Sequence, residues 1–336
     1  MKRIFLIFAF IFLVQNTFSQ NSPSISETDR IRLAETFRLG DKLADKVWPN
    51  WSKAPFAVLL VTPEHEFLVR HPSPSKDFTE IGYDKLLKSK VYRRKRVFNP
   101  AFLATFPAVG GISTIVVGQA ENTWVKNSTF WAVTLLHEHF HQLQDAQENF
   151  YKDVLALDLA NGDDSGMWMI NYPFPYRDKK INDDFSALAV QLAKALEAAD
   201  SKSFQTEFDA YLNLRKSFNA SLSEKDYRYL SFQFWKEGTA RYTEYEIAKL
   251  ASKDYKPSKD FTKLKDYKPY REVADYWRQK TIESLKTIRL EKLEREIVYP
   301  FGAAEAMLLD RAKIVWKPRY FAEKFYLDKY FEKGNF

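Results

Sequence analysis

The 336-residue chain contains no cysteine. Disulfide bonds, iron–sulfur clusters, cysteine-ligated zinc, a thiol nucleophile and the cysteine of a lipoprotein anchor are therefore excluded, and any metal must be held by His, Asp or Glu. The chain also lacks a Gly-x-Ser-x-Gly elbow and a glycine-rich phosphate loop, so serine hydrolysis and nucleotide-dependent chemistry have no sequence basis. With only 10 glycines but 16% aromatic residues, the composition favours bulky, well-filled interiors.

Long apolar runs are also scarce, and the one that stands out covers residues 4–14. Two basic residues precede it, and Thr17 and Ser19 supply small side chains, so we expect residues 1–19 to be a signal peptide and the mature chain to begin at Gln20. A membrane anchor is the less favoured alternative, because the run is short for a bilayer and nothing comparable follows. The sequence thus predicts an exported protein, periplasmic or secreted, with no membrane span in the mature chain.

The excess of basic residues is small. Removing residues 1–19 leaves 51 − 2 = 49 basic residues against 44 acidic ones, a net charge of about +5. The densest basic run, residues 93–96, lies between aromatic and apolar residues and is interpreted as a solvated strand or loop rather than a phosphate-binding patch. Nucleic acid is therefore not an expected partner.

The hydrophobic pattern changes once along the chain. Residues 24–48 have the spacing of an amphipathic helix, and β-branched and aromatic runs at 56–61, 67–69, 91–98 and 113–117 indicate strands. Helical spacing then returns and persists, at 130–147, 184–199, 204–218, 227–250, 271–296 and 320–331. Strands followed by helices predict an α+β fold, with a mixed sheet lobe over 20–126 and a helical lobe over 127–336 that together form one continuous catalytic domain.

The chemistry is concentrated in a His-Glu-x-x-His pattern at residues 137–141, inside an apolar helical segment. Four residues of helix turn the chain through about 400° and advance it about 6 Å, so His137 and His141 project side by side and can grip one metal ion. Glu138 leans toward the same side. His139 is rotated by about 200° from His137 and is interpreted as a core residue rather than a ligand. The alternative is a chance match on a buried helix.

A second segment supplies a candidate for the third ligand. The pattern Trp-x-Glu-Gly-x-Ala-x-Tyr-x-Glu at residues 235–244, downstream of His-Glu-x-x-His, resembles the gluzincin zinc metallopeptidases, the thermolysin-like clan, and most closely their aminopeptidase-like branch. That resemblance implies a zincin-like fold, Zn²⁺ as cofactor and Glu237 as the third ligand. We expect Gly238 and Ala240 to let this helix pack closely against the first. Glu244 shares the face of Glu237 and can pair with Arg241, so both are expected to support the site.

The spacing departs from the aminopeptidase branch, since 237 − 141 = 96 residues separate the second histidine from the third ligand. This leaves open whether the protein is an exopeptidase or an endopeptidase. The intervening segments 161–168 and 173–176 are rich in turns and aromatic residues, and are interpreted either as a wall of a substrate cleft or as an ordered surface loop. His65, Glu66 and His71 have the residue types of a second metal site but the wrong spacing.

Two weaker resemblances concern the substrate. The stretch Gly-Gln-Ala-Glu-Asn at 118–122 is similar to the element with which clan aminopeptidases bind a free amine, which implies substrate contacts for Gly118 and Glu121; a strand-end turn is the alternative. We expect the strand before it to be the sheet edge along which a peptide pairs. Tyr-Pro-Phe-Gly at 299–302 resembles the stretch whose tyrosine stabilises the oxyanion, so Tyr299 is either catalytic or a core tyrosine.

The sequence therefore predicts an exported zinc peptidase that cleaves a peptide or protein substrate. Water activated by zinc attacks the peptide carbonyl, with Glu138 as general base and Tyr299 as oxyanion donor. Two alternatives remain open: a zincin-fold binding protein or idle pseudopeptidase with a structural zinc, and an extracellular scaffold with an accidental motif. Oligomeric state is not indicated.

Overall fold

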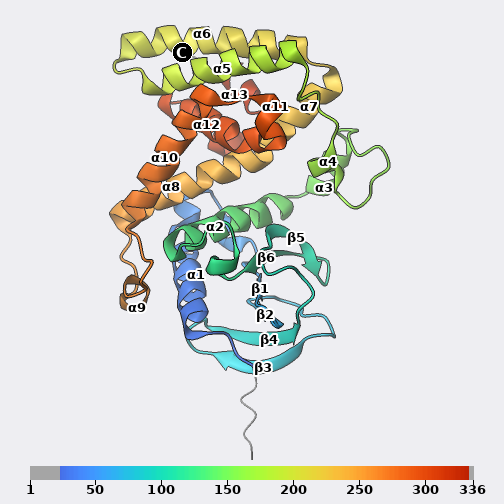
Figure 1. Ribbon diagram of the computed structural model, residues 1–336, viewed down its shortest axis with the longest axis vertical. Helices are drawn as coiled ribbons and strands as arrows, with labels where there is room; N and C mark the ends of the chain where they lie inside the picture. Colours follow the sequence, from blue (N-terminus) through green and yellow to red (C-terminus); the bar gives the residue numbers. More distant parts are fainter. Residues whose placement is uncertain (1–22, 333–336) are drawn as a thin grey trace, which may run out of the picture.

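The computed structural model describes residues 23–332 and has the α+β architecture expected from the sequence (Figure 1). Helix α1 (Glu27–Val47) comes first and is capped by Ser26, whose hydroxyl accepts a hydrogen bond from the Asp29 amide. A six-stranded sheet follows, with strands β1 (Val58–Val61), β2 (His65–Val69), β3 (Thr79–Asp84), β4 (Ser89–Lys95), β5 (Leu103–Val109) and β6 (Ile112–Gly118). The predicted signal peptide lies outside the described residues.

The sheet is mixed, as expected, with the strand order β3-β4-β2-β1-β6-β5. Strands β1 and β6 pair in parallel, and the other neighbours pair antiparallel. The expectation that the strand ending at Gly118 forms the sheet edge is wrong, because β6 is hydrogen-bonded to β1 on one side and to β5 on the other. Strand β5 is the edge on this side of the sheet.

The rest of the described chain is mainly helical. The described helices are α2 (Ser128–Asp145), α3 (Phe150–Leu155), α4 (Trp168–Asn171), α5 (Lys179–Glu197), α6 (Ser201–Ser221), α7 (Glu224–Gln233), α8 (Thr239–Asp254), α9 (Lys259–Thr262), α10 (Tyr270–Thr287), α11 (Leu290–Leu293), α12 (Val298–Arg311) and α13 (Asp328–Glu332). The helix expected over 271–296 ends earlier, at Thr287. The helix expected over 320–331 is wrong, since only its last residues, in α13, are helical.

Helix α2 lies between the two lobes. It contacts β5 and β6 on one side and α8 on the other, and Figure 1 shows it crossing the sheet beneath the helical lobe. Every residue from Ser128 to Gln144 except Phe130 is buried. A helix that is enclosed on all sides belongs to the core, so the polar residues that it carries must find partners there. One hydrophobic cluster contains residues of both lobes, and a smaller one covers the other face of the sheet.

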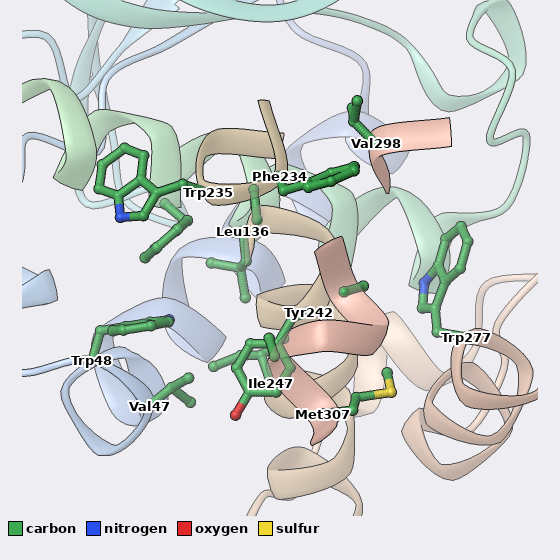
Figure 2. Packing of buried hydrophobic residues seen from close by; sticks show 14 of the residues in the cluster. Val47, Trp48, Leu136, Phe234, Trp235, Tyr242, Ile247, Trp277, Val298 and Met307 are labelled. Atoms are coloured by element: carbon green, nitrogen blue, oxygen red, sulfur yellow. The ribbon is translucent and has the colours of Figure 1, made fainter. Parts of the chain in front are cut away.

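Helices α7 and α8 are joined without a break by a π-helical turn, Phe234–Gly238. Gly238 ends this turn in contact with Gly302 of α12: a Cβ built on Gly238 would lie 2.4 Å from the Gly302 Cα. The close approach that we expected Gly238 to make with the first motif helix is thus made with α12 instead. Figure 2 shows Phe234, from the same turn, packed near Val298 at the start of α12. None of the described helices is long and apolar enough to cross a membrane.

Candidate metal centre

The two motif histidines project from α2 to the same point. The Nε2 atoms of His137 and His141 lie 3.1 Å apart, and both side chains are buried. Their rings meet edge to face with centroids 4.8 Å apart. One helical turn separates the two residues, which is why their side chains reach the same side of α2.

Glu237 approaches the pair from the π-helical turn. Its Oε2 lies 3.3 Å from the Nε2 of His141 and 3.8 Å from the Nε2 of His137, and the side chain is buried. A π-turn adds a residue to the helix and changes the direction in which its side chains point, and such turns occur frequently at functional sites. The structure thus brings together the three residues that the sequence predicts as ligands.

The spacing of these three atoms fits a metal ion. Ligand atoms bound to tetrahedral Zn²⁺ at about 2.0 to 2.1 Å lie about 3.3 to 3.4 Å from one another. The three separations here are 3.1, 3.3 and 3.8 Å, so one ion can touch all three atoms with small side-chain shifts. Two imidazoles and one carboxylate form a donor set typical of zinc. This buried group can therefore hold a metal ion.

The Nδ1 atom of each histidine, on the side of the ring away from the proposed metal, faces a polar side chain. The Nδ1 of His141 donates to the Oε1 of Gln144 over 2.6 Å, which leaves Nε2 of the neutral ring free to bind metal. Gln144 is itself fixed, because its amide nitrogen donates to the hydroxyl of Tyr320. Gln144 was not selected from the sequence, although its position three residues after His141 on the same helix is a local signal.

The other histidine faces a carboxylate. The Nδ1 of His137 lies 3.2 Å from the Oε1 of Glu244, which is fully buried on α8. Arg241 donates to the other carboxylate oxygen of Glu244 over 2.5 Å. A carboxylate behind a ligand histidine fixes the orientation of the ring and makes it a better donor to the metal. Arg241 and Glu244 thus pair as expected, and Glu244 lies next to His137.

The pKa values of His137 and Glu237 are shifted in the directions that favour a positive imidazole next to negative carboxylates. Burial disfavours the charged form of His137, but the carboxylates of Glu237 and Glu244 outweigh that effect and raise its pKa to about 9. Burial also opposes ionisation of Glu237, yet His141, His137 and Arg295 hold the pKa of this carboxyl well below its usual range. In the absence of metal, a proton takes the place of the cation between these groups, so metal and proton compete for the same site.

Glu138 lies beside the cluster on α2 and is buried. The hydroxyl of Thr105 lies 2.8 Å from its Oε2 and donates to it. Thr105 belongs to the edge strand β5, so this contact places the sheet edge next to the expected general base. Thr105 was not selected from the sequence, because β5 carries a proline and was not predicted as a strand.

A half-buried arginine connects Glu237 to Tyr299. Arg295 donates through Nη2 to the Oε1 of Glu237 over 3.1 Å, and through Nη1 to the Tyr299 hydroxyl over 3.2 Å. The Tyr299 ring lies 6.2 Å from the ring of His137, centroid to centroid. Burial, with Glu237 nearby, raises the pKa of Tyr299 well above its ordinary value, so the hydroxyl keeps its proton. Arg295 has no local sequence signal and was missed.

The predicted amine-binding element lies elsewhere. Glu121 pairs with Arg32 of α1 over 2.6 Å, and Arg32 also donates to Ser128 at the start of α2. Ser128 precedes His137 by nine residues, which corresponds to about 13 Å of helix. The structure therefore places Glu121 near the start of α2 and not next to His137. Gly118 has a packing role, because a Cβ there would lie 1.7 Å from the carbonyl oxygen of Pro100.

Two of the remaining histidines, His139 and His71, make packing and backbone contacts away from the motif pair. His139 stacks on Phe56 with ring centroids 3.8 Å apart, and burial lowers its pKa to about 4, which fits the expected core role. His71 lies 3.2 Å from the carbonyl oxygen of Val109. Glu66 is buried and pairs with Arg94 over 2.7 Å. Within the described part of the chain, His65, Glu66 and His71 do not form a group that could hold a metal.

One part of the long segment between the second histidine and the third ligand packs near the centre. Tyr172 stacks on Tyr229 of α7 with ring centroids 4.3 Å apart. Burial raises the pKa of Tyr176, and the nearby charge of Arg295 opposes this rise. Residues 161–167, in contrast, are mostly exposed and form a turn-rich surface loop. The segment thus contributes aromatic packing against α7 and a surface loop.

Comparisons of the chain with known protein families, with curated proteins and with solved structures gave no match.

Proposed function

We propose that this protein is a zinc-dependent peptidase. The observation that carries the proposal is the buried group of His137, His141 and Glu237, whose three ligand atoms have the mutual spacing that one tetrahedral ion requires. A carboxylate behind His137 and the base Glu138 next to it complete the arrangement expected of a hydrolytic centre rather than of a purely structural one. The proposal includes export of the protein, which rests only on the signal-peptide pattern of residues 1–19.

In the proposed reaction, Glu138, Thr105 and Tyr299 have different roles. A zinc ion bound to such a ligand set supplies Lewis acidity, lowering the pKa of water toward about 7 and polarising a carbonyl. Glu138 accepts the proton of the attacking water and passes it to the leaving nitrogen, while Thr105 fixes the orientation of its carboxylate. Tyr299, held by Arg295 and protonated at neutral pH, is positioned to donate a hydrogen bond to the oxyanion.

A peptide is the favoured substrate because of the edge strand. Strand β5 has a hydrogen-bonded neighbour on one side, β6, and its other side is the edge of the sheet. Thr105, in the middle of β5, contacts Glu138. An extended peptide that pairs with β5 would therefore run past the metal centre with its main chain fixed by hydrogen bonds.

A binding protein with a structural metal is the second candidate, and one observation separates the two. A structural zinc site is closed by four protein ligands, whereas a catalytic site keeps one position open. Three residues of the described chain form the group that can hold a metal. Glu138 is not among these ligands and is held instead by Thr105, which supports the peptidase.

A cleavage assay tests the proposal. Zinc-loaded wild-type protein is incubated with a peptide library, and products are identified by mass spectrometry; cleavage is expected. Glu138→Gln should keep its zinc and lose cleavage, because the amide preserves size but cannot accept the proton. Glu148→Gln is the matched control, since Glu148 is exposed just beyond α2. A zinc-loaded wild type that cleaves nothing, or a Glu138→Gln protein as active as the wild type, would contradict the proposal.

A further inference from the structure

A cavity of about 360 Å³ adjoins the metal centre, between α8, α10 and the start of α12. Two residues belong both to its lining and to the surroundings of the centre. Arg241 donates to Glu244, the carboxylate that faces His137, and Tyr299 lies against the His137 ring. A substrate held at the metal centre would thus have this cavity directly beside it.

The cationic group of Arg241 is held in place by aromatic rings. Its guanidinium carbon lies 4.0 Å from the ring centroid of Trp277, 5.5 Å from that of Tyr299 and 5.8 Å from that of Trp124. Stacking against ring faces leaves the edge of a guanidinium, with its N–H donors, as the part that can bind a ligand. One Nη1 donor is used by Glu244, and the side chain also lines the cavity.

Trp277 supplies a second donor. Its side chain is 8% exposed and lines the cavity, and Figure 2 shows its indole beside the packed helical core. The Nε1 atom is buried and has no hydrogen-bond acceptor among the described residues. A buried donor without a partner is unfavourable, so an acceptor oxygen that enters the cavity gains a hydrogen bond that the protein has left open.

The charges around the cavity favour an anionic ligand. Arg241, with a side chain 12% exposed, is the least exposed charged residue of the lining, whereas Lys280 and Glu296 are exposed at the rim and carry opposite charges. A neutral aromatic side chain would fit the aromatic walls but leave the Trp277 donor unpaired. A carboxylate meets both donors and remains near the positive guanidinium.

We propose that this cavity binds a carboxylate group of the peptide substrate, through Arg241 and the indole N–H of Trp277. The identification of this carboxylate as part of a substrate rests on the proposed peptidase function. Binding of a carboxylate in the cavity does not depend on catalysis. The carboxylate has two sources, the C-terminus of a peptide and an Asp or Glu side chain, and both present the same oxygen pair to the donors.

Two matched pairs of probes test the assignment by isothermal titration calorimetry on the zinc-loaded full chain. N-acetylphenylalanine against its amide tests a C-terminal carboxylate, and N-acetylglutamic α-amide against N-acetylglutamine amide tests a side-chain carboxylate. In at least one pair the acid should bind about tenfold or more tightly than the neutral partner, because hydrogen bonds to a charged group are the stronger ones. The pair that shows the difference identifies the source.

Two variants locate the binding. Trp277→Phe keeps a ring and removes the N–H, and should weaken the acid about tenfold while leaving the neutral probe nearly unchanged. Glu296→Gln removes the opposing rim charge and should tighten the acid by up to about fivefold. Glu283→Gln on α10, exposed and outside the cavity lining, is the matched control and should have no effect.

Acid and neutral probes that bind equally well, or do not bind at all, would overturn the proposal. Acid binding that disappears with the zinc and is insensitive to Trp277→Phe would also overturn it, since the carboxylate would then be on the metal. If Trp277→Phe does not fold, as judged by thermal melting, the response to Glu296→Gln decides instead. These readouts are independent of peptide cleavage, so failure of the peptidase assay and failure of this assignment are distinguishable.

Discussion

Gly238 and Gly302 touch backbone to backbone where the π-helical turn before α8 meets α12. A Cβ on Gly238 would lie 2.4 Å from the Gly302 Cα, and a Cβ on Gly302 would lie 2.7 Å from the carbonyl oxygen of Phe234. Glu237 immediately precedes Gly238, and Tyr299 lies three residues before Gly302 on α12. The absence of two side chains therefore lets the π-helical turn that carries Glu237 approach helix α12, which carries Tyr299.

Gly238→Ala should separate these helices, because backbone atoms cannot move aside as a flexible side chain can. We expect the free energy of unfolding to fall by about 1 to 3 kcal/mol, the usual range for an overpacked core. Urea unfolding measures this change in the free energy of unfolding. Gly302→Ala should behave similarly, and the double variant should lose less than the sum of the two, since the first methyl already opens the gap. Strict additivity would show that the two glycines do not share one contact.

Tyr299→Phe should lower the turnover number by about ten- to a thousandfold with little change in KM, zinc content or melting temperature. The ring is retained, so a loss confined to turnover reports on the hydroxyl. Tyr211→Phe is the control: its buried hydroxyl donates to Glu305, away from the centre, and its loss should reduce stability by about 1 to 3 kcal/mol without affecting turnover. An unchanged turnover number for Tyr299→Phe would remove this residue from the mechanism.

Glu244→Gln should weaken zinc binding about 10- to 100-fold, because the carboxylate behind His137 orients the ring and increases its basicity. Competition with a zinc chelator of known affinity measures the effect. Glu246→Gln on the same helix removes an equal charge that pairs with Lys249 instead, and should leave zinc affinity unchanged. Equal affinities for wild type and Glu244→Gln would mean that Glu244 plays no part in metal binding.

His71 should make the fold sensitive to mild acid. Its Nδ1 accepts from the Ser73 amide, and burial lowers its pKa below the ordinary value despite the bond to the Val109 carbonyl. The neutral ring therefore stabilises the fold fully above the unfolded-state pKa of about 6.5, and this stabilisation is lost as pH falls through the folded-state pKa. We expect His71→Gln to lose less stability than wild type between pH 7.5 and pH 5. If urea unfolding shows that wild type and His71→Gln lose the same stability between pH 7.5 and pH 5, this role is excluded.

The features that sequence predicted are those encoded by short spacings. His137 and His141 are one helical turn apart, so a single helix brings them together. Arg241 and Glu244 are likewise neighbours on α8. Glu237 was identified through its own short pattern, and its pairing with the histidines is a long-range contact that only the resemblance supplied.

The features that sequence missed depend on long-range packing. Arg295 reaches Glu237 across 58 positions of sequence, and nothing around it marks it. Strands β3 and β5 were missed because β3 is largely exposed and polar and Pro107 interrupts β5. The helix expected over 271–296 stops near Ile288, which is extended, and Glu294 then adopts a positive φ of 46°. Sequence periodicity does not report such backbone turns.

Metal analysis of the purified chain tests the central claim most directly. Emission spectrometry on wild-type protein should find close to one zinc per chain, and on Glu237→Ala at least tenfold less after dialysis, because removal of the third ligand opens the site and weakens it. Glu148→Ala, exposed and remote from the ligands, should retain the wild-type content. Less than about a tenth of an equivalent of zinc in the wild type, or a Glu237→Ala protein that holds zinc as tightly as the parent, would contradict the assignment of His137, His141 and Glu237 as a zinc centre.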